Sequence, residues 1–172
     1  MRTVIIIAFL SIAFVFSLTI SRLGYFEKVS IFEVKQTPVS LICINYQGTV
    51  HDISKAFETF SATVTQDTSD YYAVVYQTKP SIFDDHPTEA KVCAKLQAKK
   101  QYPKFEHYSF EPKRSLTTLF RGHPAVGQLK IYQEFDTFLK TKNSTFTVSG
   151  PFLEIYHHDN GDEITEYWAT IQ

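Results

Sequence analysis

Two stretches of this sequence show the same succession of hydrophobic periodicities, and this succession restricts the fold more than any other feature. In the first stretch, the extended segments "KVSIFEV" and "VSLICINY" precede "TVHDISKAFETFSATV", in which apolar residues recur at helical spacing. The extended segments "DYYAVVYQT" and "EAKVCAKLQ" follow. A period of two is typical of strands, and a period of 3.6 is typical of amphipathic helices. From "VSLICINY" onward, this stretch therefore predicts the order strand, helix, strand, strand.

The second stretch repeats this order. "KFEHYSF" and "SLTTLFRG" are extended, "HPAVGQLKIYQEFDTFLKTKN" is helical with Pro124 suited to its first turn, and "PFLEIYHH" and "EITEYWATI" form a hairpin around the turn signal Asp159-Asn160-Gly161-Asp162. We therefore predict an α+β fold of two βαββ repeats with pseudo-twofold symmetry. Its antiparallel sheets carry the helices on one face, and a cleft lies between the halves.

An uncharged apolar segment, Val4 to Ile20, precedes these repeats. As a helix it is roughly 25 Å long, close to the ~30 Å hydrocarbon core of a bilayer. We predict a single transmembrane anchor over residues 1–24 and a globular domain over residues 25–172, with a cleaved signal peptide as the alternative. Basic residues after the segment favour a cytosolic domain under the positive-inside tendency.

Composition restricts the function of the domain. The net charge of −1 argues against nucleic-acid binding, which normally requires a clustered basic face, so no nucleic-acid partner is predicted. Cys43 and Cys93 lie in apolar segments and are predicted to be buried thiols, with a disulfide only if the domain faces an oxidising space. His157 and His158 are adjacent on a strand and point to opposite faces, so no metal site is predicted. No cofactor motif is present.

The order of these segments, with "VVYQTKP", "KVCAKL" and "GPFLEIYHHD" in sequence, resembles the gyrase-inhibitor-like domains, which are related to bacterial effector-binding domains and to the SOUL fold. The apolar segment running into "LGYFEKVSIFEV" is also similar to the single-pass receptors of endoplasmic-reticulum autophagy. The resemblance implies a ligand-binding domain in the endoplasmic-reticulum membrane. The acidic tail that carries the autophagy motif of those receptors has no counterpart here, so its activity is not carried over.

The resemblance also implies that a glutamate on the last strand lies in the ligand cleft, and Glu166 matches its position. Glu166 shares a strand face with Trp168, because alternate residues of a strand point the same way. A carboxylate and aromatic rings in a poorly hydrated cleft favour organic cations and amphiphiles. Glu154 with Tyr156 is the alternative acid. Tyr72 and Tyr76 are candidate walls of the cleft.

The sequence is compatible with three functions. The first is binding of a small amphiphilic or cationic ligand, the second is hydrolysis of reactive small molecules by a cleft glutamate with an assisting tyrosine, and the third is a protein adaptor with a vestigial cleft. The first is favoured, and no catalytic residue is assigned. Asn143, in the sequence "NST", is a glycosylation acceptor only if the domain is lumenal.

Overall fold

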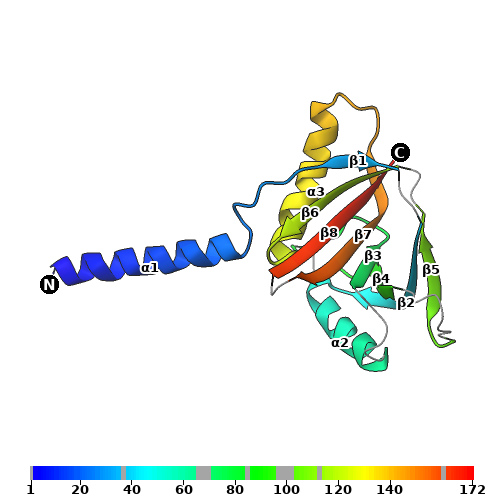
Figure 1. Cartoon of the computed structure of the whole chain (residues 1–172), viewed down its shortest axis with the longest axis horizontal. Helices are drawn as coiled ribbons and strands as arrows, with labels where there is room; N and C mark the ends of the chain where they lie inside the picture. The colour runs from blue at the N-terminus through cyan, green and yellow to red at the C-terminus, as the bar shows by residue number, and fades with distance from the viewer. Residues whose placement is uncertain are drawn as a thin grey trace.

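The computed structural model describes residues 2–35, 38–64, 71–83, 86–95, 103–111, 114–159 and 162–172. In these residues the helices are α1 (Arg2–Arg22), α2 (Ile53–Thr63) and α3 (Pro124–Thr141), and a 3-10 turn, η1 (Val50–Asp52), leads into α2 (Figure 1). The strands are β1 (Phe32–Val34), β2 (Val39–Gly48), β3 (Tyr72–Tyr76), β4 (Thr88–Lys95), β5 (Glu106–Phe110), β6 (Ser115–Arg121), β7 (Val148–Asp159) and β8 (Asp162–Ile171).

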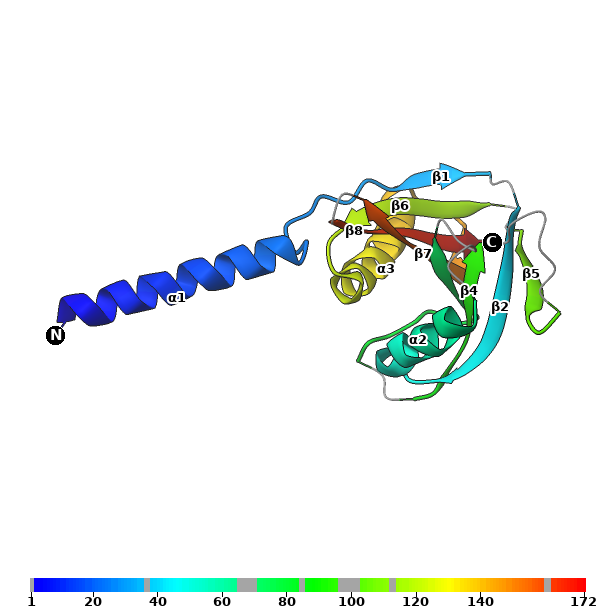
Figure 2. The ribbon, with the colours of Figure 1, turned by 60° about the horizontal axis from the view of Figure 1, so that its bottom comes forward.

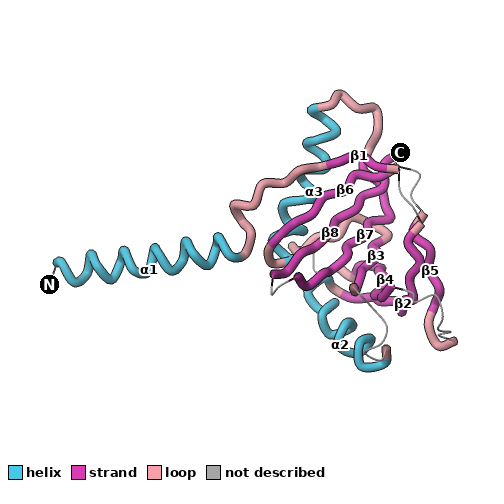
Figure 3. Tube along the Cα trace, in the orientation of Figure 1, coloured by secondary structure: helices cyan, strands magenta, loops and turns pink. Residues whose placement is uncertain are grey.

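The strands form one antiparallel sheet in the order β1-β6-β8-β7-β3-β4-β2-β5 (Figure 3). The predicted α+β class is therefore confirmed, with a single eight-stranded sheet. The predicted pseudo-twofold repeat stays a prediction. Residues 160 and 161 of the predicted turn lie outside the described residues, but β7 and β8 pair as far as Asp159 opposite Asp162, as a hairpin requires.

Both α2 and α3 cover the same face of the sheet (Figure 2). Ile131, Tyr132 and Phe135 of α3 pack in one buried cluster with Val74, Phe152 and Tyr167 of the central strands. Phe60 of α2 packs in a neighbouring cluster with Ile42, Val92 and Ala94. Apolar residues at helical spacing on each helix meet alternate residues of the strands, so the main core lies between the helices and this face.

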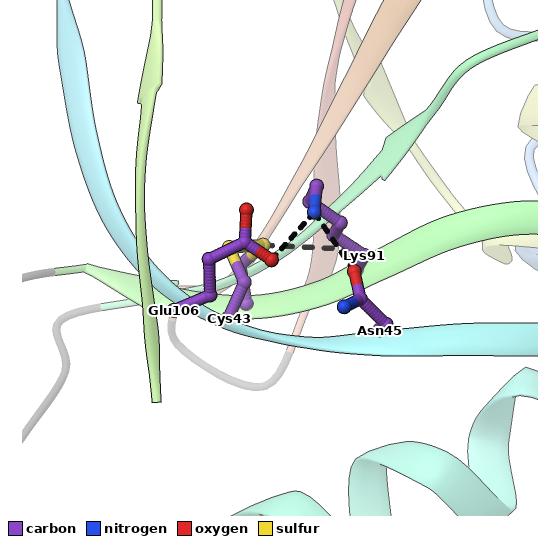
Figure 4. Close-up of a disulfide and its surroundings, with 5 residues drawn as sticks. Cys43, Asn45, Lys91 and Glu106 are labelled. Atoms are coloured by element: carbon purple, nitrogen blue, oxygen red, sulfur yellow. Dashed lines mark hydrogen bonds and ion pairs between the residues drawn. A yellow bond between two sulfur atoms is a disulfide. The ribbon is translucent and has the colours of Figure 1, made fainter. Parts of the chain in front are cut away.

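The opposite face of the sheet is also apolar at its centre, where Leu41, Ala73, Leu153 and Trp168 are buried together. Cys43 and Cys93 lie opposite each other on β2 and β4 and form a disulfide, as Figure 4 shows. The prediction of two buried free thiols was therefore wrong. The antiparallel register brings the two residues face to face although 50 residues separate them in sequence.

Helix α1 extends away from the sheet, and its described apolar side chains, among them Phe9, Phe14 and Phe16, are exposed. At its end, the carbonyl oxygen of Leu23 accepts a hydrogen bond from the His123 N–H, at 3.2 Å. In the described part of the chain no helix is long and apolar enough to cross a membrane, so the transmembrane helix predicted within residues 1–24 is not found.

Gly127 allows α3 to approach the sheet closely. A Cβ atom at this position would overlap the hydroxyl group of Tyr167, which is buried and donates a hydrogen bond to the Pro124 carbonyl oxygen at 2.9 Å. We expect Gly127→Ala to lower the free energy of unfolding by about 1–3 kcal/mol, because Tyr167 is held by the core and cannot move aside freely. Urea denaturation measures the effect.

The control for this substitution is Thr137→Ala, on the exposed face of the same helix. It should change the free energy of unfolding by no more than about 0.5 kcal/mol. A Gly127→Ala variant as stable as the unchanged protein would show that the helix can shift without cost.

Candidate functional site

A pocket of about 720 Å³ lies between η1 and α2 on one side and the start of α3 and the β7–β8 hairpin on the other. Val50, Ile53, Phe57 and Ile82 give it an apolar lining. This volume is within the range of pockets that hold drug-sized ligands. Its polar lining residues are His51, Ser54, Glu58, Ser61, Tyr72, His123, Gln128, Tyr156, His157, Glu163 and Thr165.

Glu154 lies directly behind this lining, on the central strand β7. Its side chain is fully buried and points to the helix-covered face of the sheet, since it pairs with Val74 and Tyr167. The Tyr132 hydroxyl donates to Oε1 at 2.7 Å, and the Tyr156 hydroxyl donates to Oε2 at 2.6 Å. Gln128 Nε2 lies 3.0 Å from Oε1 and 2.9 Å from Oε2 and donates to the carboxylate. Two of these donors, Gln128 and Tyr156, line the pocket.

The environment of Glu154 has two opposing effects on its ionisation. Burial raises the pKa of Glu154, and the hydrogen bonds from Tyr132, Tyr156 and Gln128 act in the opposite direction by stabilising the carboxylate. No cationic side chain in the described residues forms an ion pair with it. When Glu154 is ionised, its negative charge is therefore solvated by neutral donors and is not cancelled.

The phenols around Glu154 remain protonated at neutral pH. Burial, and after it the charge of Glu154, raises the pKa of Tyr76, Tyr132 and Tyr156 well above the ordinary value for tyrosine. All three phenols are therefore poor general bases, and the hydroxyl groups of Tyr132 and Tyr156 act as hydrogen-bond donors to the carboxylate.

Three of the residues predicted from the sequence come together at this pocket. Tyr72 and Tyr156 line it, and both rings contact Phe57 edge-on, with centroid separations of 6.0 and 5.6 Å. Glu154 lies behind the lining of the pocket and accepts a hydrogen bond from the Tyr156 hydroxyl. Tyr76 was predicted as a wall but is fully buried in the core, where its hydroxyl accepts a hydrogen bond from Gln128 Nε2 at 3.2 Å.

Glu166 and Trp168 share a strand face, as predicted, but that face is turned away from the pocket. Glu166 pairs with Ile155 and Trp168 with Leu153, whereas Glu154 pairs with Tyr167. Glu166 is partly exposed and lies 3.7 Å from Nε2 of His157. Burial raises the pKa of Glu166, and His157 opposes this shift. Glu166 therefore does not line this pocket, because the register of the hairpin gives the helix-covered face to Glu154.

Two residues of the site were missed as functional candidates. Tyr132 and Gln128 both lie in the segment predicted to be helical, but neither was predicted as a site residue. Gln128 precedes Tyr132 by four residues, so both lie on the buried face of α3. A polar residue on an otherwise apolar helix face was the available signal.

Neither metal ligands nor a glycan attachment is assigned by the geometry. No group of three or more His, Cys, Asp or Glu side chains in the described residues is arranged to hold a metal ion. Asn143 is exposed just beyond α3 with φ of 49°, and its glycosylation stays a prediction for a lumenal domain.

The sequence matches no protein-family model, and no curated protein is significantly similar to it. Solved structures do match its fold. The C-terminal domain of EcmrR has a TM-score of 0.59 at 10% identity, covering 84% of this chain and 97% of that one. SAV2435 bound to tetraphenylphosphonium has a TM-score of 0.54 at 14% identity, covering 83% and 94%.

An integron cassette protein of Vibrio cholerae has a TM-score of 0.55 at 11% identity, and the match covers 85% of this chain and 97% of that protein. These comparisons give no support for the resemblance to SOUL proteins or to receptors of reticulum autophagy. At such identities the likeness concerns the fold alone. The chain shares its fold with SAV2435 and with the C-terminal domain of EcmrR.

Proposed function

We propose that this domain binds a small organic cation with an apolar or aromatic body in the pocket between α2, α3 and the β7–β8 hairpin. The observation that carries the proposal is Glu154, a fully buried carboxyl group with neutral hydrogen-bond donors behind an apolar pocket. In a medium of low polarity, an anion without a countercharge is costly, and a cation brought close to it recovers part of that cost.

The lining of the pocket fits the apolar part of such a ligand. Ile53, Phe57 and Ile82 provide apolar surface, and the rings of Tyr72 and Tyr156 provide aromatic faces or edges. Cation–π contacts contribute about 0.5–2 kcal/mol each, depending on how far the site is desolvated. The fold neighbour SAV2435, which is bound to tetraphenylphosphonium, supports the choice of an organic cation.

Binding is favoured over hydrolysis because of the position of the carboxylate. A nucleophilic or basic glutamate must reach the substrate, whereas Glu154 is fully buried behind Gln128 and Tyr156. The phenols that are hydrogen-bonded to it are also poor general bases, because their raised pKa values keep them protonated at neutral pH. An adaptor with a vestigial cleft is disfavoured by the volume of the pocket, about 720 Å³.

The proposal is tested by calorimetric titration of the full chain with three naphthalene compounds of similar shape. Naphthylmethylammonium carries charge and N–H groups, its N,N,N-trimethyl derivative carries charge alone, and naphthalenemethanol is neutral. We expect at least one of the cations to bind about tenfold or more tightly than the alcohol, because only a cation interacts favourably with Glu154. Equal binding of all three compounds would contradict the proposal.

A further inference from the structure

The carboxylate of Glu154 has no free acceptor site for a ligand. A carboxylate offers about four lone-pair positions. Tyr132 donates to Oε1, Tyr156 donates to Oε2, and Gln128 Nε2, which also donates to the Tyr76 hydroxyl, shares its other hydrogen between the two carboxylate oxygens. An N–H group on a bound cation would have to displace one of these donors to reach Glu154 directly. A ligand that leaves the network intact must donate its hydrogen bond to another atom.

The side-chain amide of Gln128 presents such an atom. Its Nε2 is turned to Glu154 and to the Tyr76 hydroxyl, and the orientation of the amide is fixed by chemistry. The reverse orientation would set the amide oxygen against two carboxylate oxygens, all of which are acceptors. The nitrogen and oxygen of a planar amide point in different directions, so Oε1 is turned away from the carboxylate.

Oε1 of Gln128 accepts no hydrogen bond from the residues that the structure describes. Gln128 is only 8% exposed, and it lines the pocket. Donation from Nε2 to a carboxylate also polarises the amide and strengthens its oxygen as an acceptor. The other carbonyl-type acceptors on side chains of the lining belong to Glu58 and Glu163, which are exposed, and ion pairs at exposed sites contribute little.

From this geometry we infer that the pocket selects protonated amines that carry N–H groups over quaternary cations, with Gln128 Oε1 as the acceptor of the ligand N–H. This inference rests on the proposed function and narrows its ligand class. Glu154 supplies the negative charge and polarises the Gln128 amide. Gln128 Oε1 then accepts a directional hydrogen bond from the ligand. Gln128 is thus the residue that determines specificity, and Tyr132 and Tyr156 hold the carboxylate in position.

The test compares naphthylmethylammonium with its N,N,N-trimethyl derivative by calorimetry on the full chain. We expect the ammonium to bind about ten to a hundred times more tightly, the usual effect of one hydrogen bond that involves a charged group. In Gln128→Met, which keeps the length of the side chain and removes the acceptor, the two affinities should lie within about threefold of each other.

The matched control is Gln133→Met, the same substitution on the exposed face of α3, which should keep the full preference. Equal affinities in the unchanged protein would overturn the inference. A preference that persists in Gln128→Met would also overturn it, because the difference would then come from the bulk of the methyl groups.

These outcomes separate the inference from the proposed function. If both cations bind more tightly than naphthalenemethanol but equally well, the proposed function stands and the selection for N–H groups is wrong. If neither cation binds more tightly than the alcohol, both are wrong. If the Gln128→Met variant does not fold, the comparison of the two cations on the unchanged protein still tests the selection for N–H groups.

Discussion

Replacing Glu154 with glutamine is expected to weaken the binding of naphthylmethylammonium by about tenfold to a hundredfold. The substitution removes the buried negative charge and keeps the size of the side chain. The affinity for naphthalenemethanol should change little, because a neutral ligand gains nothing from that charge. Calorimetric titration of the full chain at neutral pH with both compounds measures the two effects.

Glu166→Gln is the matched control for this prediction. Both glutamates lie on the central hairpin, and burial raises the pKa of each, but Glu166 is on the opposite face of the sheet. Cation affinity should therefore be unchanged in Glu166→Gln. Loss of binding in this variant, with binding retained in Glu154→Gln, would move the site to the other face and refute the pocket described above.

Stability should respond to the Glu154 substitution in a pH-dependent way. Because burial raises the pKa of Glu154, the folded protein holds this proton more tightly than the unfolded chain does. The contribution to stability is present below the unfolded pKa, about 4.3, and is lost as pH rises through the higher folded value. Relative to the unchanged protein, Glu154→Gln should become more stable as pH rises through this interval. Urea denaturation at a series of pH values measures the difference.

Loss of the Cys43–Cys93 disulfide is expected to lower the free energy of unfolding by about 4 kcal/mol in the chain-entropy account. The bond closes a loop between residues 50 apart in sequence, and without it the unfolded chain gains the conformations that the loop excludes. The measurement is urea denaturation of the full chain with and without a reducing agent.

The control is the double substitution of Cys43 and Cys93 with alanine. This variant should unfold at about the same urea concentration as the reduced protein, and the reducing agent should have no effect on it. An unchanged protein that is equally stable under oxidising and reducing conditions would show that the strands β2 and β4 pair firmly without the bond.

The secondary structure could be predicted from the sequence because each element has a clear periodicity. The predicted helix over "HPAVGQLKIYQEFDTFLKTKN" contains α3, and "VSLICINY" lies within β2. The strand predicted over "KVSIFEV" is shorter, because among the described residues Phe32–Val34 form β1, which pairs with β6 at the edge of the sheet. Local alternation indicates an extended conformation, but it does not show how many of those residues pair with a neighbouring strand.

The acidic residue of the site could not be chosen from the sequence. Glu154 and Glu166 each alternate with aromatic residues, and both faces of the central strands are buried, so neither pattern shows which face the helices cover. That choice depends on the register between β7 and β8, and a shift of one residue exchanges the faces. Gln128 and Tyr132 come from a distant helix, and only the packing of α3 on the sheet brings them to Glu154.

At its middle, the eight-stranded sheet divides into β1-β6-β8-β7 and β3-β4-β2-β5. Among the described residues, the ladder between β3 and β7 is the connection, running from Tyr72 opposite Tyr156 to Tyr76 opposite Phe152. Glu154 occupies the middle of this ladder, opposite Val74. The carboxylate whose donors Gln128 and Tyr156 line the pocket therefore lies on the ladder that joins the two halves of the sheet.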